Sequence, residues 1–363
     1  MDERPLEEFV ASIVGDTHLR IEDDLGGGYV RLKASEAERR QALQDIRCVE
    51  DAVLEILRNS RDAHARNIFL AISSGQNNIR KVSVIDDGEG IPKHMHEAVF
   101  EPRVTSKLDT FHMDKWGVHG RGMALYSIAQ NTVSHGVVFS DVMKGCAVYF
   151  EADTASLPEK KDQSTFPSFE AGADGSYYMR GPKNILRIAC EFALEHRGEL
   201  NVYVGSPSEI ASTMYKMGLS SVNEAIRIFS NTPDEFMATL RLSLADSPSE
   251  FVDLAAALGI ELSERSARRI MDGEVPALDS LTTVLGYLLH QSSQTPVSDK
   301  PVKRASRKSD KVKIDASDID SLLAIVNASF KDIAERYYLD DDIKASAKVT
   351  SNEIVISIPI KRQ

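Results

Sequence analysis

Three short runs between residues 51 and 128 constrain the fold of this chain most strongly. The first, DAVLEILRNSRDA at 51–63, has apolar residues near helical spacing. The second, VSVIDDGEGI at 82–91, is an apolar strand pattern that ends in acidic residues and glycines. The third, GVHGRGMALYSI at 117–128, places glycines before a predicted helix, which is an arrangement suited to phosphate binding. The runs predict a helix, a strand with a tight turn, and a glycine-rich helix start.

In this order and at this spacing, the runs resemble the N, G1 and G2 boxes of the GHKL ATPase superfamily. That superfamily includes DNA gyrase B subunits, heat-shock chaperone ATPases, sensor histidine kinases and MutL-type mismatch-repair proteins. The resemblance covers roughly residues 1–155. It implies an α+β fold that begins with a GHKL (Bergerat) α/β sandwich on a mixed sheet, with ATP and Mg²⁺ as cofactors. We expect the helices to cover one face of that sheet.

The resemblance also implies roles for individual residues. Asp86 would accept a hydrogen bond from the adenine amine, and Gly88 and Gly90 would let the backbone approach the base. Asn59 would ligate Mg²⁺, a cation that prefers oxygen donors, and Asp62 would support it from the same helix face. The candidate ATP-contacting residues are Asn59, Asp62, Asp86, Gly88, Gly90, Ile91, Thr105, Lys107, Gly117, Gly120, Arg121 and Gly122. For Lys107 and Arg121, a phosphate contact and a solvated surface position both stay open.

Glu55 bears on the choice between hydrolysis and phosphotransfer. It lies one helical turn before Asn59, where gyrase and MutL relatives carry the glutamate that activates water. The resemblance therefore implies an ATPase with Glu55 as general base. Two alternatives stay open: a kinase-like protein that phosphorylates a separate partner, and a regulator that uses ATP as a non-hydrolysed ligand. An autonomous sensor kinase is disfavoured, because the only histidine before the first run is His18, in a predicted hairpin at 18–32.

Residues 92–116, called the lid segment below, have no steady period and are too long for a simple connection. They include EPRVTSK at 101–107, which resembles a run found in both kinases and MutL proteins. We expect this segment to close over ATP, coupled to homodimerisation through the ATPase domain.

A second resemblance lies downstream. Residues 251–289 are similar to the helix-turn-helix of the Cro and phage-repressor family, with LAAALGI as its second helix and turn. Residues 263–273 match the recognition helix. The DNA-contact candidates are Arg265, Ser266, Arg268 and Arg269. Because such folds also bind proteins, the predicted function is an ATPase whose nucleotide state controls a DNA- or protein-binding region.

The remaining chain divides by composition. After the ATP-binding domain at 1–155 we expect a linker at 156–182, a small α/β to helical segment at 183–240 and the helix-turn-helix-like domain at 241–290. The last two predicted segments are a disordered basic linker at 291–312 and a helix and strand at 313–363. Residues 35–64 read as one long helix.

The net charge of −12 argues against a surface that binds nucleic acid everywhere, although the segment at 300–313 is locally basic. No run of roughly 18 or more apolar residues occurs, so we expect no membrane span. The acidic N-terminus lacks an apolar signal core, and the three cysteines have no metal-binding spacing. These features favour a cytoplasmic protein.

Overall fold

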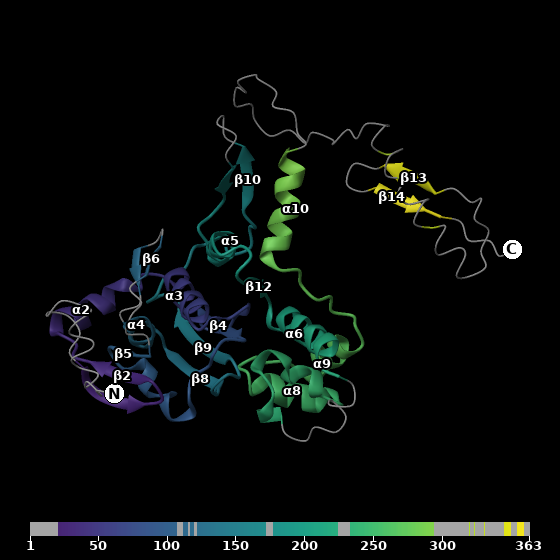
Figure 1. The fold of residues 1–363 in the computed structure, drawn as a ribbon. Coiled ribbons are helices and arrows are strands. Elements are labelled where there is room, and N and C mark those ends of the chain that lie inside the picture. Colours follow the sequence, from purple (N-terminus) through teal and green to yellow (C-terminus); the bar gives the residue numbers. More distant parts are fainter. Residues whose placement is uncertain are drawn as a thin grey trace, which may run out of the picture. The chain divides into compact units, whose positions relative to one another are not determined.

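The computed structural model forms two compact units, residues 1–296 and 297–363 (Figure 1). It describes residues 21–106, 112–114, 117–119, 122–171, 177–223, 233–293, 319, 323, 330, 345–349 and 354–358. In the second unit, β13 (Ser346–Val349) pairs antiparallel with β14 (Ile354–Ser357). Residues 1–20 and most of 291–344 lie outside the described residues.

The first unit is built on a five-stranded mixed sheet, which confirms the α+β class. Its order is β12 (Asn201–Gly205), β3 (Asn67–Ser74), β4 (Ile79–Asp86), β9 (Cys146–Asp153) and β8 (Ser134–Ser140). β12 runs parallel to β3, and the other neighbours are antiparallel. The sheet therefore takes in a strand that follows the predicted domain boundary at 155.

One face of the sheet packs against four helices. They are α3 (Val49–Asp62), α4 (Ala124–Asn131), α5 (Ile185–Glu195) and α10 (Leu281–Ser293). Alternate strand residues point to this side, among them Ile68, Val84 and Phe150, and all three are buried. This core carries the helix of the first sequence run.

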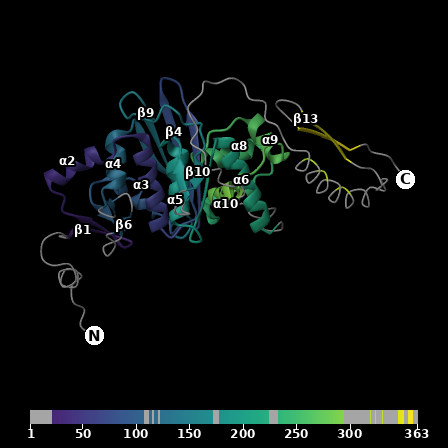
Figure 2. The ribbon, with the colours of Figure 1, turned by 90° about the horizontal axis from the view of Figure 1, so that it is seen from above.

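The opposite face is covered as well, so the expectation of helices on one face was wrong. The covering layer consists of α6 (Pro207–Ser221), the 3₁₀ helices η4 (Pro233–Glu235) and η5 (Ala238–Leu244), α8 (Pro248–Ala256) and α9 (Glu264–Met271). In Figure 2, α6, α8 and α9 lie on the side of β4 and β9 opposite α3 and α4. Phe69, Ile85 and Phe139 of the sheet pack into this layer. We call it the helical layer. A strand buried on both faces is apolar at successive positions, which is the pattern of Ile68 to Ala71.

The predicted helix at 35–64 is two helices, α2 (Glu36–Asp45) and α3. Ile46 and Cys48 adopt extended backbone conformations between them, and Ile46 is buried. The Asp51 carboxylate accepts a hydrogen bond from the Arg47 N–H at 3.0 Å. A side chain of α3 thus bonds a backbone group that precedes the helix, which favours the break that periodicity did not reveal.

The predicted hairpin is β1 (Ile21–Gly26) with β2 (Tyr29–Leu32), and β2 also pairs with β5 (Val104–Thr105) of the lid segment. The rest of that segment holds η2 (Lys93–Met95), η3 (Ala98–Phe100) and β6 (His112–Asp114), which pairs with β7 (Gly117–His119). The predicted linker contains the hairpin of β10 (Ser168–Ala171) with β11 (Tyr177–Arg180).

In the described part of the chain, no helix is long and apolar enough to cross a membrane.

Two glycines with the same backbone conformation test how tightly the β8–β9 turn is packed. Gly145 has φ +77°, and a Cβ there would lie 2.1 Å from the Asp86 carbonyl oxygen. Gly26 has φ +78° with no atom within 4 Å of its Cβ position. We expect Gly26→Ala to lower the free energy of unfolding by about 1 kcal/mol, and Gly145→Ala by about 3 kcal/mol or more, because overpacking adds to the strain. Urea denaturation of both variants measures this, and equal losses would contradict the contact.

Candidate functional site

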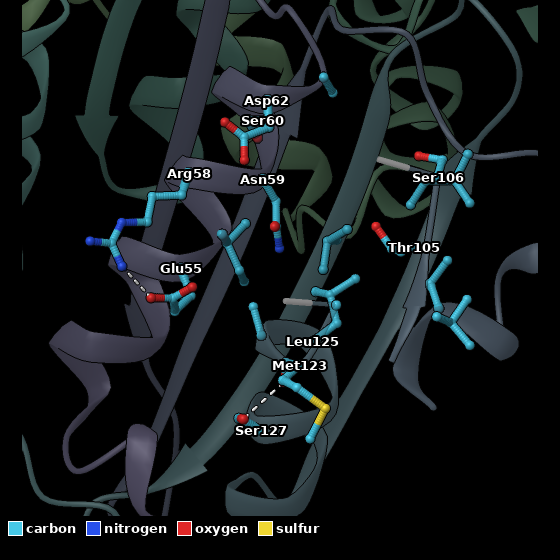
Figure 3. A pocket seen from close by; sticks show the side chains of 18 of the residues that line it. Glu55, Arg58, Asn59, Ser60, Asp62, Thr105, Ser106, Met123, Leu125 and Ser127 are labelled. Carbon is cyan, nitrogen blue, oxygen red and sulfur yellow. Dashed lines mark hydrogen bonds and ion pairs between the residues drawn. The ribbon is translucent and has the colours of Figure 1, made fainter. Parts of the chain in front are cut away.

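A cavity of about 500 Å³ lies between α3, β4, the lid segment and the start of α4 (Figure 3). Its wall is apolar at Ile56, Val84, Ile91, Val99 and Val148. Polar and charged side chains from α2, α3 and the lid segment line the remainder. The cavity is within the size range of small-molecule sites, which combine apolar walls with a few fixed polar groups.

Asp86 closes the apolar end of the cavity. It is the last residue of β4 and is 5% exposed. Its carboxylate accepts hydrogen bonds from the Ser60 hydroxyl at 2.7 Å and from the Gly88 N–H at 2.9 Å. Burial nevertheless raises the pKa of Asp86 to about 6, because desolvation disfavours the charged form. Ser60 was missed from the sequence, although it directly follows Asn59.

The two glycines after Asp86 lie so close to neighbouring backbone carbonyl groups that no Cβ fits at either position. A Cβ on Gly88 would lie 2.7 Å from the Ala63 carbonyl oxygen. A Cβ on Gly90, where φ is +75°, would lie 2.0 Å from the Asp141 carbonyl oxygen. The sequence interpretation gave these glycines a role in approaching a ligand, and the structure adds this packing requirement. Of the two, Gly90 lines the cavity.

Asn59 projects from α3 into the cavity (Figure 3). Its amide nitrogen is buried and has no hydrogen-bond partner among the described residues. A buried amide without a partner costs free energy, so this group is suited to a bound ligand.

The donor set near Asn59 fits a cation that shares its ligands with a bound molecule. Asn59 lines the cavity and offers an amide oxygen. The described residues contain no group of three or more His, Cys, Asp or Glu that could hold a metal alone. Mg²⁺ commonly takes one or two protein oxygens and completes its shell with water and phosphate oxygens, so the residues present are compatible with it.

Glu55 and Asp62 flank Asn59 on α3, and each is held by an arginine. The Glu55 carboxylate lies 2.5 Å from Arg58 Nη1, and the Asp62 carboxylate lies 2.7 Å from Arg61 Nη2. The Arg58 side chain is 6% exposed. Arg58 was not among the candidates predicted from the sequence, since nothing in the first run distinguishes it from a surface arginine.

The start of α4 forms another part of the wall. Gly122, Met123, Ala124 and Leu125 line the cavity there, and Gly122 has φ +65°. The first N–H groups of a helix have no intrahelical acceptor and can bind an anion. Gly117 lies in β7, while Lys107, Gly120 and Arg121 lie outside the described residues.

The lid segment and the N-terminal hairpin complete the cavity. Thr105 was a predicted candidate, whereas Tyr29 and Arg103, which also line the cavity, were not. Arg103 forms an ion pair with Glu38 of α2 and has φ +59°, an unusual backbone conformation for this residue type. Its N–H donates to the Gly122 carbonyl at 2.8 Å, and its carbonyl accepts from the Leu32 N–H at 3.0 Å. These two bonds hold the strained residue in place.

The predicted DNA-contact residues lie on α9, in the helical layer. Arg265, Arg268 and Arg269 are exposed, Ser266 is partly exposed, and the opposite side of α9 is buried through Ala267 and Ile270. Arg269 forms an ion pair with Glu274 at 2.9 Å. The Ser263 hydroxyl accepts from the Ser266 N–H at 3.2 Å and caps the helix. The helix therefore presents arginines outward, on the face of the sheet opposite α3.

Comparison with known proteins identifies relatives of the region around the cavity. Residues 46–140 match the model of the family of histidine kinase-, DNA gyrase B- and HSP90-like ATPases. The DNA mismatch repair protein MutL of Thermus aquaticus is 40% identical over 83 residues, which are 23% of this chain and 15% of that protein. MutL of Staphylococcus carnosus (strain TM300) is 32% identical over 139 residues, which are 37% of this chain and 21% of that protein. The matches thus span about a fifth or less of these two MutL proteins.

One solved structure, full-length ShkA in complex with AMPPNP, overlaps 55% of this chain and 44% of its own at 18% identity. The TM-score of this overlap is 0.22.

The raised pKa of Asp86 gives a pH dependence of stability that can be measured. Between its ordinary pKa of 3.8 and about 6, the folded protein binds a proton that the unfolded chain releases. The free energy of unfolding contributed by Asp86 therefore falls as pH rises through this window, by about 3 kcal/mol. Urea denaturation of the wild type and of Asp86→Asn, each at pH 4 and pH 7, isolates this contribution. The same pH dependence in both proteins would contradict it.

Proposed function

Because residues 46–140 contain a domain of the histidine kinase-, DNA gyrase B- and HSP90-like ATPase family, we propose that this protein binds ATP with Mg²⁺ in the cavity and hydrolyses the ATP. The observation that carries the proposal is the amide of Asn59, whose buried nitrogen has no partner among the described residues and which shares one cavity with buried Asp86 and the start of α4. The amide nitrogen can donate to a ligand, and the amide oxygen can ligate a cation. These features supply a cation ligand, a hydrogen-bond acceptor and a phosphate-binding helix start.

The adenine base occupies the apolar end. The Asp86 carboxylate, fixed by Ser60 and Gly88, accepts a hydrogen bond from the exocyclic amine. With a pKa of about 6, Asp86 is mainly ionised at neutral pH and acts as an acceptor only. Ile56, Ile91 and Val148 provide apolar contact with the ring, and Thr105 lies on the lid side.

The phosphates lie between Asn59 and the start of α4. Asn59 would hold Mg²⁺, which when bound neutralises phosphate charge. The α4 N–H groups and the backbone at Gly122 favour anionic oxygens. The Glu55 carboxylate is one turn of α3 from Asn59, where it accepts the proton of the attacking water.

We further propose that the nucleotide state controls the helical layer and the DNA- or protein-binding surface of α9. Support comes from the β8–β9 turn, which contacts the loop after Asp86. The Met143 N–H donates to the Glu89 carbonyl at 2.6 Å, and the Gly145 N–H donates to the Gly88 carbonyl at 3.1 Å. A shift of this loop on nucleotide binding therefore displaces the turn.

The same turn contacts the helical layer. The Ala238 N–H donates to the Lys144 carbonyl at 2.8 Å, and Lys144 Nζ donates to the Asp234 carbonyl at 2.9 Å. The buried Arg241 guanidinium stacks over Phe139 of β8, 3.5 Å from the ring centroid. Hydrogen bonds and packing thus connect the nucleotide loop to the layer that carries α8 and α9.

The ATPase proposal predicts that Glu55→Gln lowers turnover by at least about 100-fold and leaves ATP affinity within a few-fold, since general bases contribute about 10²- to 10⁴-fold. Conversion of ATP to ADP and phosphate, with and without duplex DNA, measures turnover, and calorimetry measures binding. Glu191→Gln is the control, because Glu191 pairs with Arg187 within α5, away from the cavity wall. Full turnover in Glu55→Gln would exclude the base, and phosphate on a histidine or serine of a partner would favour the kinase alternative.

The α9 proposal predicts that replacing Arg265 and Arg268 together by Ala weakens binding of duplex DNA. The slope of log affinity against log salt should become shallower by about 2, or about 1 for each lost phosphate contact. Fluorescence anisotropy between roughly 50 and 200 mM salt measures both quantities. Arg40→Ala on α2, an exposed arginine paired with Glu36, is the control. If neither the affinity nor the slope changes, α9 does not contact DNA, and binding of a protein partner remains as the proposed role of this surface.

A further inference from the structure

Arg58 lines the cavity, but the proposed ATPase mechanism assigns no role to it. It follows Glu55 by three positions on α3, so the two side chains lie on the same side of the helix. Their charged ends are 2.5 Å apart, and the exposed fractions of the side chains are 6% for Arg58 and 22% for Glu55 (Figure 3). A charged pair this sheltered has lost most of its hydration, so its members depend on each other.

The charges around the cavity explain why Glu55 needs a cation. Six carboxylates line the cavity: Glu38, Asp45, Glu55, Asp62, Asp86 and Glu89. The described cationic side chains of the wall are Arg58 and Arg103, and Arg103 is paired with Glu38. Bound phosphates would add further negative charge next to Glu55. Like charges disfavour an ionised carboxylate, whereas a guanidinium in contact favours it.

An arginine also fixes the orientation of a carboxylate that it contacts. Its guanidinium is planar, always charged and donates several hydrogen bonds, so it restricts the rotamer of the carboxylate that it contacts. Figure 3 shows Arg58 extending from α3 toward Glu55 and away from Asn59. This direction separates Arg58 from the place assigned to Mg²⁺ and the phosphates, and it favours a role exerted through Glu55.

We propose that Arg58 is a positioning residue that keeps Glu55 ionised and oriented for proton abstraction from water. This inference rests on the proposed ATPase function and adds a residue to it. Arg58 takes part in no covalent step, because the proton moves from water to the Glu55 carboxylate while the arginine stays charged. The role is therefore visible in kcat and in its pH profile, with little change in ATP affinity.

The test compares the wild type with Arg58→Gln and Arg58→Lys in the full chain, after circular dichroism has shown that each variant is folded. For each protein, kcat and KM are measured from pH 5 to pH 9. We expect Arg58→Gln to lower kcat about 10- to 100-fold at neutral pH, within the contribution of a general base, and to change KM less than about threefold. The acid limb of its kcat profile should move to higher pH, because a carboxylate without its cation has a higher pKa. Arg58→Lys retains the charge, so its limb should lie nearer that of the wild type.

The matched control is Arg187→Gln. Arg187 pairs with Glu191 at 2.8 Å within α5, and the Glu191 side chain is 22% exposed, like that of Glu55. Loss of this helical pair away from the cavity wall should leave kcat and its pH profile unchanged. A parallel loss in the control would mean that weakened packing, and not positioning, lowers kcat.

A double-mutant cycle shows whether Arg58 acts through Glu55. In the Glu55→Gln background, adding Arg58→Gln should cause no further loss of kcat, because residues that act as a unit are not additive. Additive losses, or a raised KM with unchanged kcat, would overturn the proposal and make Arg58 an independent phosphate ligand. If the wild type binds ATP without hydrolysing it, the positioning role of Arg58 is refuted, but the assignment of the cavity as a nucleotide site still holds. Absence of ATP binding would refute the proposed function itself.

Discussion

The site depends on the close approach of backbone segments around the turn that follows β4. Gly88 packs on the Ala63 carbonyl, Gly90 on the Asp141 carbonyl and Gly145 on the Asp86 carbonyl, each closer than a Cβ permits. This packing joins the end of α3, the turn and the β8–β9 connection into one rigid region. Asp86 is thereby held with a fixed set of hydrogen-bond donors at the closed end of the cavity. Burial of its carboxylate is the electrostatic cost of that arrangement.

The sheet separates two kinds of surface. On the α3 side, carboxylates line the cavity and their effect is offset by the Arg58 and Arg103 ion pairs. On the other side, α9 presents exposed arginines, although the net charge of the chain is −12. The helical layer is anchored to the strands by the Ser83 hydroxyl, which donates to the Gly259 carbonyl at 2.7 Å, and by Lys81, which pairs with Glu151 and Glu261. The two surfaces therefore share one structural element.

Much of the cavity could be predicted from the sequence, because its residues belong to short runs with fixed local geometry. Glu55 and Asn59 share a helix face, Asp86 ends a strand, and Gly122 precedes a helix, and the structure places all four at one cavity. The residues that were missed depend on contacts between distant segments. Arg103 pairs with Glu38, 65 positions away, and no local pattern encodes such a pair. Ser60 is different, since its place beside Asn59 was a usable signal.

The second layer was missed for a related reason. The helices at 207–271 each have one apolar side, which predicts that they pack against another part of the protein. This pattern does not identify the surface that they cover. The strands held the missing information, since Phe69 and Ala71 are apolar on the face opposite Ile68 and Leu70. A sheet with one solvated face would alternate apolar and polar residues there. The break between α2 and α3 was hidden because buried Ile46 continues the helical spacing.

The parallel pairing of β12 with β3 has a consequence for how the chain folds. Residues 201–205 must pair with residues 67–71, so the sheet is completed only after more than half of the chain has been made. Until the helical layer follows, Phe69, Ile85 and Phe139 have nothing to cover them. Such long-range closure slows folding and leaves an apolar face and a strand edge exposed in the meantime. During synthesis, this apolar face therefore stays exposed to aggregation until the helical layer docks.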